Sequence, residues 1–303
     1  MKSMKTTAFG IELECTGITR HKAATVAKKV LGGTVDYVGG YYNTYKLTAQ
    51  DGREWKFTYD GSILCQRKAG DSTINASKEY STEVVSPILT YQDDMETLQT
   101  LIRELRKAGA FANESCGIHI HLDGADHSPR SVKNFVNIIY SHEELFHKAF
   151  GILRTRESYC RPLEDELVKR INKVRLDDFS CLEDAWYEGY YGSRCEHYHR
   201  SRYHFVNLHS FFHGHGTIEL RGFNSTLHAG EVRAFIAFAL AVNWQALKQR
   251  CASTKKPQNE NEKFAMRTFL NRIGLIGDEY KACRVHLTKN LSGCSAWRFG
   301  RTA

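Results

Sequence analysis

Three segments of the chain alternate apolar and polar residues with a period of two, which predicts β-strands. The apolar residues of each segment share one face, and acids, histidines or an arginine share the other. These segments are Ala8–Cys15, Gly117–Asp123 and Thr217–Phe223. A fourth predicted strand, Glu83–Leu89, is mainly apolar after its initial acid. We therefore expect strands that have one buried face and one polar face.

Two further strands are predicted as a hairpin, because a glycine-containing turn at Gln50–Arg53 joins Tyr41–Thr48 to Trp55–Tyr59. Apolar residues at helical spacing predict six helices. They are Ala23–Leu31, Asp93–Lys107, Ser131–Phe150, Glu164–Val174, Glu231–Arg250 and Glu262–Ile273. Because hairpins and helices are grouped separately along the chain, we expect an α+β fold with a mainly antiparallel sheet.

The polar faces of the three alternating strands carry residue pairs that are unusual for a solvent-facing sheet. The pairs are Glu12 with Glu14, His119 with His121, and Glu219 with Arg221. Each pair alone is also typical of a solvated strand face. If the strands are neighbours, however, their carboxylates repel one another, and a divalent cation relieves that repulsion. Carboxylates suit Mg²⁺, and Mn²⁺ accepts histidine more readily, so the combination predicts a metal–carboxylate site.

Composition places the protein among soluble globular proteins, with 42% hydrophobic and 25% charged residues in 303 positions. No apolar run approaches the roughly 20 residues of a membrane span, and the N-terminus lacks the apolar core of a signal peptide. Nine cysteines without a CxxC pair favour reduced thiols, and we expect a cytoplasmic location. Cys195-Glu-His197-Tyr-His199 resembles a metal-binding fragment, but no second cysteine pair lies nearby.

Charge is unevenly distributed along the chain. Residues 250–303 hold 11 Lys and Arg against 4 Asp and Glu, within a net charge of +8. This basic region is predicted to be helical, either with a solvated face or with affinity for phosphate or nucleic acid. Residues 151–200, rich in charge, tyrosine and cysteine, are a candidate insertion or lid. We expect residues 1–303 to form one catalytic domain that includes both regions.

Five sequence blocks occur in the order found in a known family. They are Phe9–Glu14, Asp60–Ile63, Glu83–Pro87, Gly117–Leu122 and Thr217–Phe223. On these blocks the chain resembles the putative amidoligase family, a relative of glutamine synthetase and glutamate–cysteine ligase in the carboxylate–amine ligase superfamily. Tyr203–His209 is similar to the family's segment that bears arginine and asparagine. The resemblance implies a glutamine-synthetase-like catalytic fold, in which a curved sheet has one metal-binding face and helices pack on the other.

The resemblance also implies roles for individual residues. The implied metal ligands are Glu12, Glu14, Glu83, His119 and Glu219, with Glu79 as a companion of Glu83. Glu12 and Glu14 match acids that bind different Mg²⁺ ions. The implied catalytic residues are Glu219, His121 near the phosphates, and Arg221 at the transferred phosphate. The implied nucleotide or acyl-phosphate contacts are Arg202, Asn207, Asp60 and Ser62, although Asp60-Gly-Ser62 is also typical of a tight turn.

The expected function is ATP- and Mg²⁺-dependent formation of an amide or isopeptide bond through an acyl phosphate. The substrates would be a carboxylate and an amine, either small molecules or peptides, and Trp186–Tyr203 is either a substrate-binding segment or a structural loop. Two alternatives stay open at this point, a metal-dependent hydrolase with the same ligands and a basic nucleic-acid-binding module. The acid-rich face argues against nucleic acid at that surface. Homo-oligomers are common among such enzymes, but no interface pattern is present.

Overall fold

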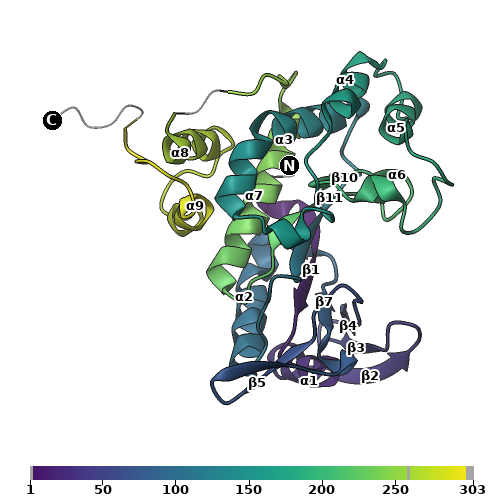
Figure 1. Ribbon diagram of the computed structural model, residues 1–303, viewed down its shortest axis with the longest axis vertical. Coiled ribbons are helices and arrows are strands. Elements are labelled where there is room, and N and C mark those ends of the chain that lie inside the picture. The colour runs from purple at the N-terminus through teal and green to yellow at the C-terminus, as the bar shows by residue number, and fades with distance from the viewer. Residues whose placement is uncertain (1–2, 258–259, 298–303) are drawn as a thin grey trace.

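A computed structural model describes residues 3–257 and 260–297 of the chain and shows an α+β arrangement (Figure 1). A nine-stranded antiparallel sheet has the order β10-β11-β9-β1-β7-β4-β3-β2, and β8 pairs with β1. The sheet is open, with β10 and β2 at its edges. Its strands are β1 Ala8–Cys15, β2 Thr34–Gly39, β3 Thr44–Thr48, β4 Glu54–Thr58, β7 Thr82–Val85, β8 Leu89–Thr90, β9 Gly117–Asp123, β10 Val206–Asn207 and β11 Thr217–Asn224. A separate hairpin consists of β5 Gln66–Ala69 and β6 Ser72–Asn75.

All six predicted helices are confirmed, and their ends differ from the predicted ones by at most three residues. They are α1 Arg20–Leu31, α2 Tyr91–Lys107, α3 Pro129–Phe150, α4 Asp165–Lys173, α7 Ala229–Lys248 and α8 Glu262–Arg272. Two short helices, α5 Ser180–Tyr187 and α6 His209–Phe212, were not expected from the sequence. A third, α9 Lys281–Thr288, lies in the basic region predicted to be helical but is not one of the six predicted helices.

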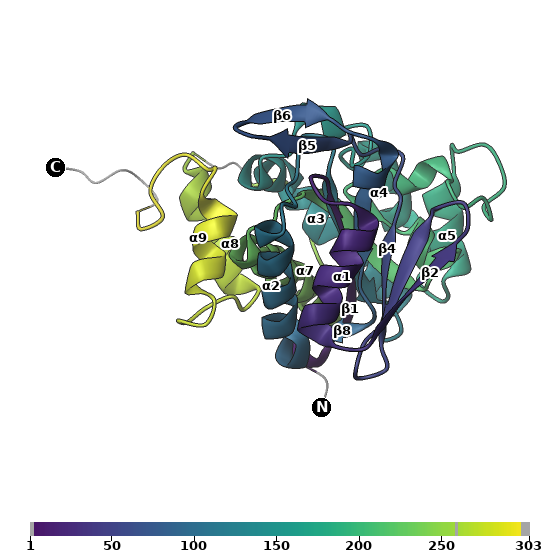
Figure 2. The same cartoon turned by 90° about the horizontal axis from the view of Figure 1, so that it is seen from below.

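The main core lies between the apolar face of the sheet and a layer of helices. In β1 the alternate residues Phe9, Ile11 and Leu13 are at most 3% exposed, as the period of two predicts. Helices α1, α2 and α7 lie side by side over this face, and α3 packs against α7 (Figure 2). Helix α7 is buried along most of its length, including every residue from Ala234 to Asn243. The opposite face of the central strands is therefore left for the polar residues.

The C-terminal helices lie on the side of α7 away from the sheet, where α9 packs against α7, and α8 packs against α9 and α3 (Figure 1). At the other end of the molecule, α4 and α5 belong to the segment expected to be an insertion or lid. The described part of the basic C-terminal region contains the helices α8 and α9. Residues 258–259 and 298–303 of that region lie outside the described residues. Among the described residues no helix is long and apolar enough to cross a membrane.

The expectation of one continuous strand over Glu83–Leu89 was wrong. Strand β7 ends at Val85, and Ser86 turns toward β1, where its hydroxyl accepts a hydrogen bond from Ile11 N at 2.9 Å. Pro87 has no amide hydrogen and so contributes no donor to a strand ladder. The predicted strand Tyr41–Thr48 also starts late, at Thr44, because residues 40–43 turn from β2 into β3 and Asn43 has a φ of 45°.

Candidate metal centre

Strand order brings the polar pairs of the sequence together. Strands β11, β9, β1 and β7 are consecutive neighbours in the sheet. Residues directly opposite each other on antiparallel strands project from the same face, with Cβ atoms about 5 Å apart. The opposed pairs are Glu219 with His121, Glu12 with His119, and Glu14 with Glu83. The condition for a shared polar site, that these strands be neighbours, is therefore met.

Three groups of side chains on this face have ligand atoms within 4.8 Å of one another. The groups are Glu12–Glu83–His119, Glu12–His121–Glu219 and Glu14–Asp60–Glu83. Glu12 belongs to two groups and so does Glu83. Together the groups form a continuous row of carboxylates and imidazoles across the sheet, which we call the metal centre.

His119 lies in the middle of this row. Its Nδ1 is 2.9 Å from Glu12 Oε2 and 3.7 Å from Glu219 Oε1, and its Nε2 is 3.8 Å from Glu14 Oε1. Burial lowers the pKa of His119, and the nearby Arg221 cation lowers it further, so the neutral ring is favoured. A neutral imidazole is the form that ligates metals.

His121 occupies the position between Glu12 and Glu219. Its Nε2 lies 3.2 Å from Glu12 Oε1, but within the described part of the chain this buried nitrogen has no partner aligned for a hydrogen bond. Its Nδ1 is 3.1 Å from Thr217 Oγ1, which fixes the ring. Burial alone would lower the pKa of His121, but the charges of Glu12 and Glu219 outweigh burial and raise it.

Glu14 and Glu83 show the electrostatic cost of this arrangement. Burial, together with the charge of Asp60, raises the pKa of Glu14 from 4.5 to about 8. Burial likewise raises the pKa of Glu83 well above its ordinary value, and Glu12 and Glu14 add to the rise. Both carboxyl groups therefore hold protons readily in the absence of a cation. A bound divalent cation would reverse this preference by favouring the ionised forms.

Glu219 has the opposite character because Arg221 neutralises it. Arg221 Nη1 donates to Glu219 Oε1, and Asn207 Nδ2 donates to Glu219 Oε2 at 2.6 Å. Burial on its own would raise the pKa of Glu219, but Arg221 and the two histidines lower it to about 2. Glu219 is thus held ionised at one end of the row.

The remaining predicted site residues divide into two sets. Asp60 joins Glu14 and Glu83, while its Oδ1 also accepts hydrogen bonds from the amide (2.6 Å) and hydroxyl (2.5 Å) of Ser62. The Asp-Gly-Ser block is therefore both a tight turn and part of the metal centre. Asn207 is buried and its side-chain amide donates to Glu219, so it positions that carboxylate.

Arg202 and Glu79 are not brought into the row. Arg202 stacks on the rings of Tyr198 and Tyr203 and donates to the carbonyl of His197 at 3.1 Å. Glu79 lies in a 3₁₀ turn, where its carbonyl accepts from Arg20. The fragment Cys195–His199, which resembles a metal-binding motif but was not expected to bind a metal, does not form a metal-ligand group in the described residues. His199 Nδ1 pairs with Ser201, and Cys195 faces His213.

Arg156 is a site-supporting residue that sequence reasoning missed. It is 3% exposed, and it donates to the backbone carbonyls of Phe223 (2.5 Å) and Arg221 (3.3 Å) at the irregular part of β11. Gly117 makes room for it, since a Cβ on Gly117 would lie 2.1 Å from Arg156 Nη2. A single arginine inside a charge-rich segment gives no periodic signal, so its role emerges only from the tertiary structure.

The segment 188–203 reaches across to the far side of the sheet. The hydroxyl of Tyr198 is 2.5 Å from that of Tyr42, which lies in the turn between β2 and β3. The two residues are 156 positions apart in sequence. This contact joins the segment to the turn between β2 and β3.

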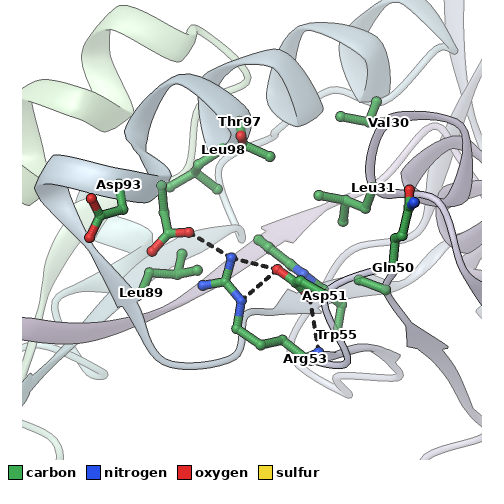
Figure 3. Close-up of a pocket in the computed structure, with 12 residues that line it drawn as sticks. Val30, Leu31, Gln50, Asp51, Arg53, Trp55, Leu89, Asp93, Thr97 and Leu98 are labelled. Atoms are coloured by element: carbon green, nitrogen blue, oxygen red, sulfur yellow. Dashed lines mark hydrogen bonds and ion pairs between the residues drawn. The ribbon is translucent and has the colours of Figure 1, made fainter.

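A separate cavity of about 480 Å³ lies between α1, α2 and the β3–β4 hairpin (Figure 3). Trp55, Leu89 and Leu98 form part of its apolar wall. At its polar end Arg53 forms ion pairs with Asp51 at 2.8 Å and Asp94 at 2.7 Å. Because these acids already neutralise Arg53, the cavity offers no free cation for a phosphate.

A comparison with known families gives a match that covers most of the chain. Residues 5–243 match the model of a family described as "putative amidoligase enzyme". The chain belongs to this family. The match spans every strand and side chain of the metal centre and ends within α7, so α8 and α9 lie beyond it. A search of curated proteins finds no match for this amidoligase-family protein.

Proposed function

We propose that this amidoligase-family protein is an ATP-dependent carboxylate–amine ligase with a glutamine-synthetase-like catalytic fold. The observation that carries the proposal is the row of three carboxylate–imidazole groups with Arg221 at its end, in a chain of this family. A carboxylate lacks a leaving group, so the reaction would begin by phosphoryl transfer from ATP. The resulting acyl phosphate would then be attacked by the amine.

The donor set fits Mg²⁺ or Mn²⁺. It consists of carboxylate oxygens and imidazole nitrogens, and it includes one buried, unaligned nitrogen on His121. Glu12, Glu14, Glu83, His119 and Glu219 would hold the ions, with Asp60 and His121 as further ligands. Bound divalent cations would stabilise the charge that develops on the phosphoryl oxygens.

Other residues of the chain would act on the substrates directly. Arg221, already buried beside Glu219, would contact the transferred phosphate and compensate its charge. Arg202 would contact the nucleotide only after leaving its stack on Tyr198. The segment 188–203 would cover the polar face and exclude water from the acyl phosphate. Small-molecule or peptide substrates fit the family, and an ATP-using enzyme with nine free cysteines suits the cytoplasm.

The test is nucleotide turnover by purified protein with Mg²⁺ or Mn²⁺ and pools of carboxylates and amines. ADP and phosphate release that requires the metal, the carboxylate and the amine supports a ligase. Glu219→Gln should abolish release while the unfolding midpoint stays close to that of the unaltered protein. Cleavage of amides that requires metal but not ATP would instead identify a hydrolase. A fully active Glu219→Gln protein would contradict the assignment of the site.

A further inference from the structure

A second chemical constellation lies in the segment predicted as a lid and in the residues just after it. The Sγ of Cys195 is 4.0 Å from Nδ1 of His213, and Nε2 of His213 is 2.8 Å from Oε1 of Glu183. The three residues come from different places, since Glu183 is on α5, Cys195 is in the following loop and His213 directly follows α6. None of them belongs to the three groups of the metal centre.

The order thiol–imidazole–carboxylate is the order that nucleophilic catalysis requires. Glu183 accepts a hydrogen bond from Nε2–H of His213, and this fixes the tautomer in which Nδ1 carries a lone pair. That lone pair faces the thiol and can take its proton. The separation of 4.0 Å is at the outer limit for a hydrogen bond to sulfur, and such contacts commonly shorten when substrate binds.

Neighbouring groups hold the base and the acid in place. Arg194 Nη1 lies 3.3 Å from Glu183 Oε1, the same oxygen that pairs with His213, and 2.7 Å from Asp184 Oδ1, so two partners hold this carboxylate oxygen in place. The ring of Tyr187, itself 4% exposed, packs edge-on against His213 with centroids 5.6 Å apart. The thiol of Cys195 is exposed, so a substrate can reach it.

We propose that Cys195, His213 and Glu183 form a second, metal-independent site that accepts activated acyl groups, such as those of esters and thioesters. The thiol proton moves to His213 Nδ1 as the sulfur attacks the acyl carbonyl. The bond from the carbonyl carbon to the leaving group breaks, and His213 returns the proton to that group. Water or an amine then attacks the thioester through the same base, the carbon–sulfur bond breaks and the thiol is restored. No oxidant, reductant or nucleotide is consumed.

The probe for this site is an aryl acetate ester, given to the full-length protein with a chelator and without nucleotide. Cys251 and Cys294, the other exposed cysteines, serve as internal references in peptide mass analysis of the acetylated protein. We expect Cys195 to be acetylated at least about 100-fold faster than Cys251, the usual contribution of a positioned base. His213→Gln and Glu183→Gln should remove most of this advantage, and imidazole should restore it to His213→Ala.

His197→Gln is the matched control, because this exposed histidine lies two residues from Cys195 but outside the constellation. In this variant Cys195 should be acetylated at the same rate as in the unaltered protein. Acetylation of Cys195 no faster than that of Cys251, or an undiminished rate in His213→Gln, would overturn the proposal. Because the assay contains neither ATP nor metal, its outcome is separate from the outcome of the ligase assay.

Discussion

Glu143 makes the stability of this protein depend on pH in a way that one substitution can isolate. Its side chain is 4% exposed on α3, where Oε2 accepts a hydrogen bond from Leu163 N at 2.9 Å. Its Oε1 has no hydrogen-bond partner in the described residues. Burial raises the pKa of Glu143 from 4.5 to about 8. Ionising this carboxyl group therefore costs far more in the folded chain than in the unfolded one.

The sign of the pH dependence follows from this raised pKa. The folded state keeps the proton up to about pH 8, whereas the unfolded state loses it near pH 4.5, so the folded state binds more protons in between. The stability that protonated Glu143 contributes to the folded state is fully present below about pH 4.5 and is lost as the pH rises from there through 8. Over the interval from pH 5 to pH 8 the loss amounts to about 3–4 kcal/mol of unfolding free energy.

Glu143→Gln should abolish this loss, because a neutral amide of the same shape can still accept the hydrogen bond from Leu163 N. Urea unfolding, followed by tryptophan fluorescence at pH 5, 6, 7 and 8, would measure the unfolding free energy at each pH. The variant should gain stability over the unaltered protein progressively toward pH 8. Glu144→Gln is the control, since it removes a neighbouring carboxylate whose side chain is 83% exposed and leaves the buried Glu143 in place, so most of the stability loss toward pH 8 should persist in it. If the unfolding free energies of Glu143→Gln and of the unaltered protein change in parallel with pH, the reasoning is refuted.

Three further predictions concern the metal centre and the segment 188–203. Gly117→Ala should displace the Arg156 guanidinium and lower the unfolding free energy by about 3 kcal/mol or more, because two hydrogen bonds from a buried cation are lost. A urea unfolding midpoint equal to that of the unaltered protein would contradict this. Mn²⁺ affinity measured by calorimetry should rise from pH 6 to pH 8, because Glu14, with its pKa of about 8, must release a proton to bind the ion. An affinity that does not change with pH would count against Glu14 as a ligand. Tyr198→Phe should make the segment 188–203 more sensitive to limited proteolysis, because the bond to Tyr42 is lost, with less than about 1 kcal/mol change in global stability. Equal cleavage rates would show that this bond does not hold the segment.

Much of the metal centre could be predicted because its residues lie on strands with strict alternation. Glu12 and His119 each sit between apolar neighbours, so the period of two alone assigns them to the polar face. Neighbouring placement of the strands could not be derived from that period, since strand order depends on tertiary packing. The family resemblance supplied the expectation that they meet.

Residues outside the alternating strands were harder to place. Asn207 lies on a strand of two residues, which is too short to show a pattern, and its role depends on a partner twelve positions away. The break at Ser86–Ile88 was missed because Val84, Val85, Ile88 and Leu89 suggest one apolar strand. The short helices α5 and α6 form where the chain packs around Trp186 and Tyr187, which only the tertiary structure reveals.

The sharing of Glu12 and Glu83 between neighbouring groups has a consequence for how the centre would fill. Ions that share a carboxylate do not bind independently, because the first ion orients and ionises a ligand that the second also uses. Occupancy should therefore show cooperativity, and the loss of Glu12 should lower the metal stoichiometry more than the loss of Glu14, which serves one group. Replacing successive carboxylates along the row would then give a graded series of proteins, each retaining fewer ions than the last.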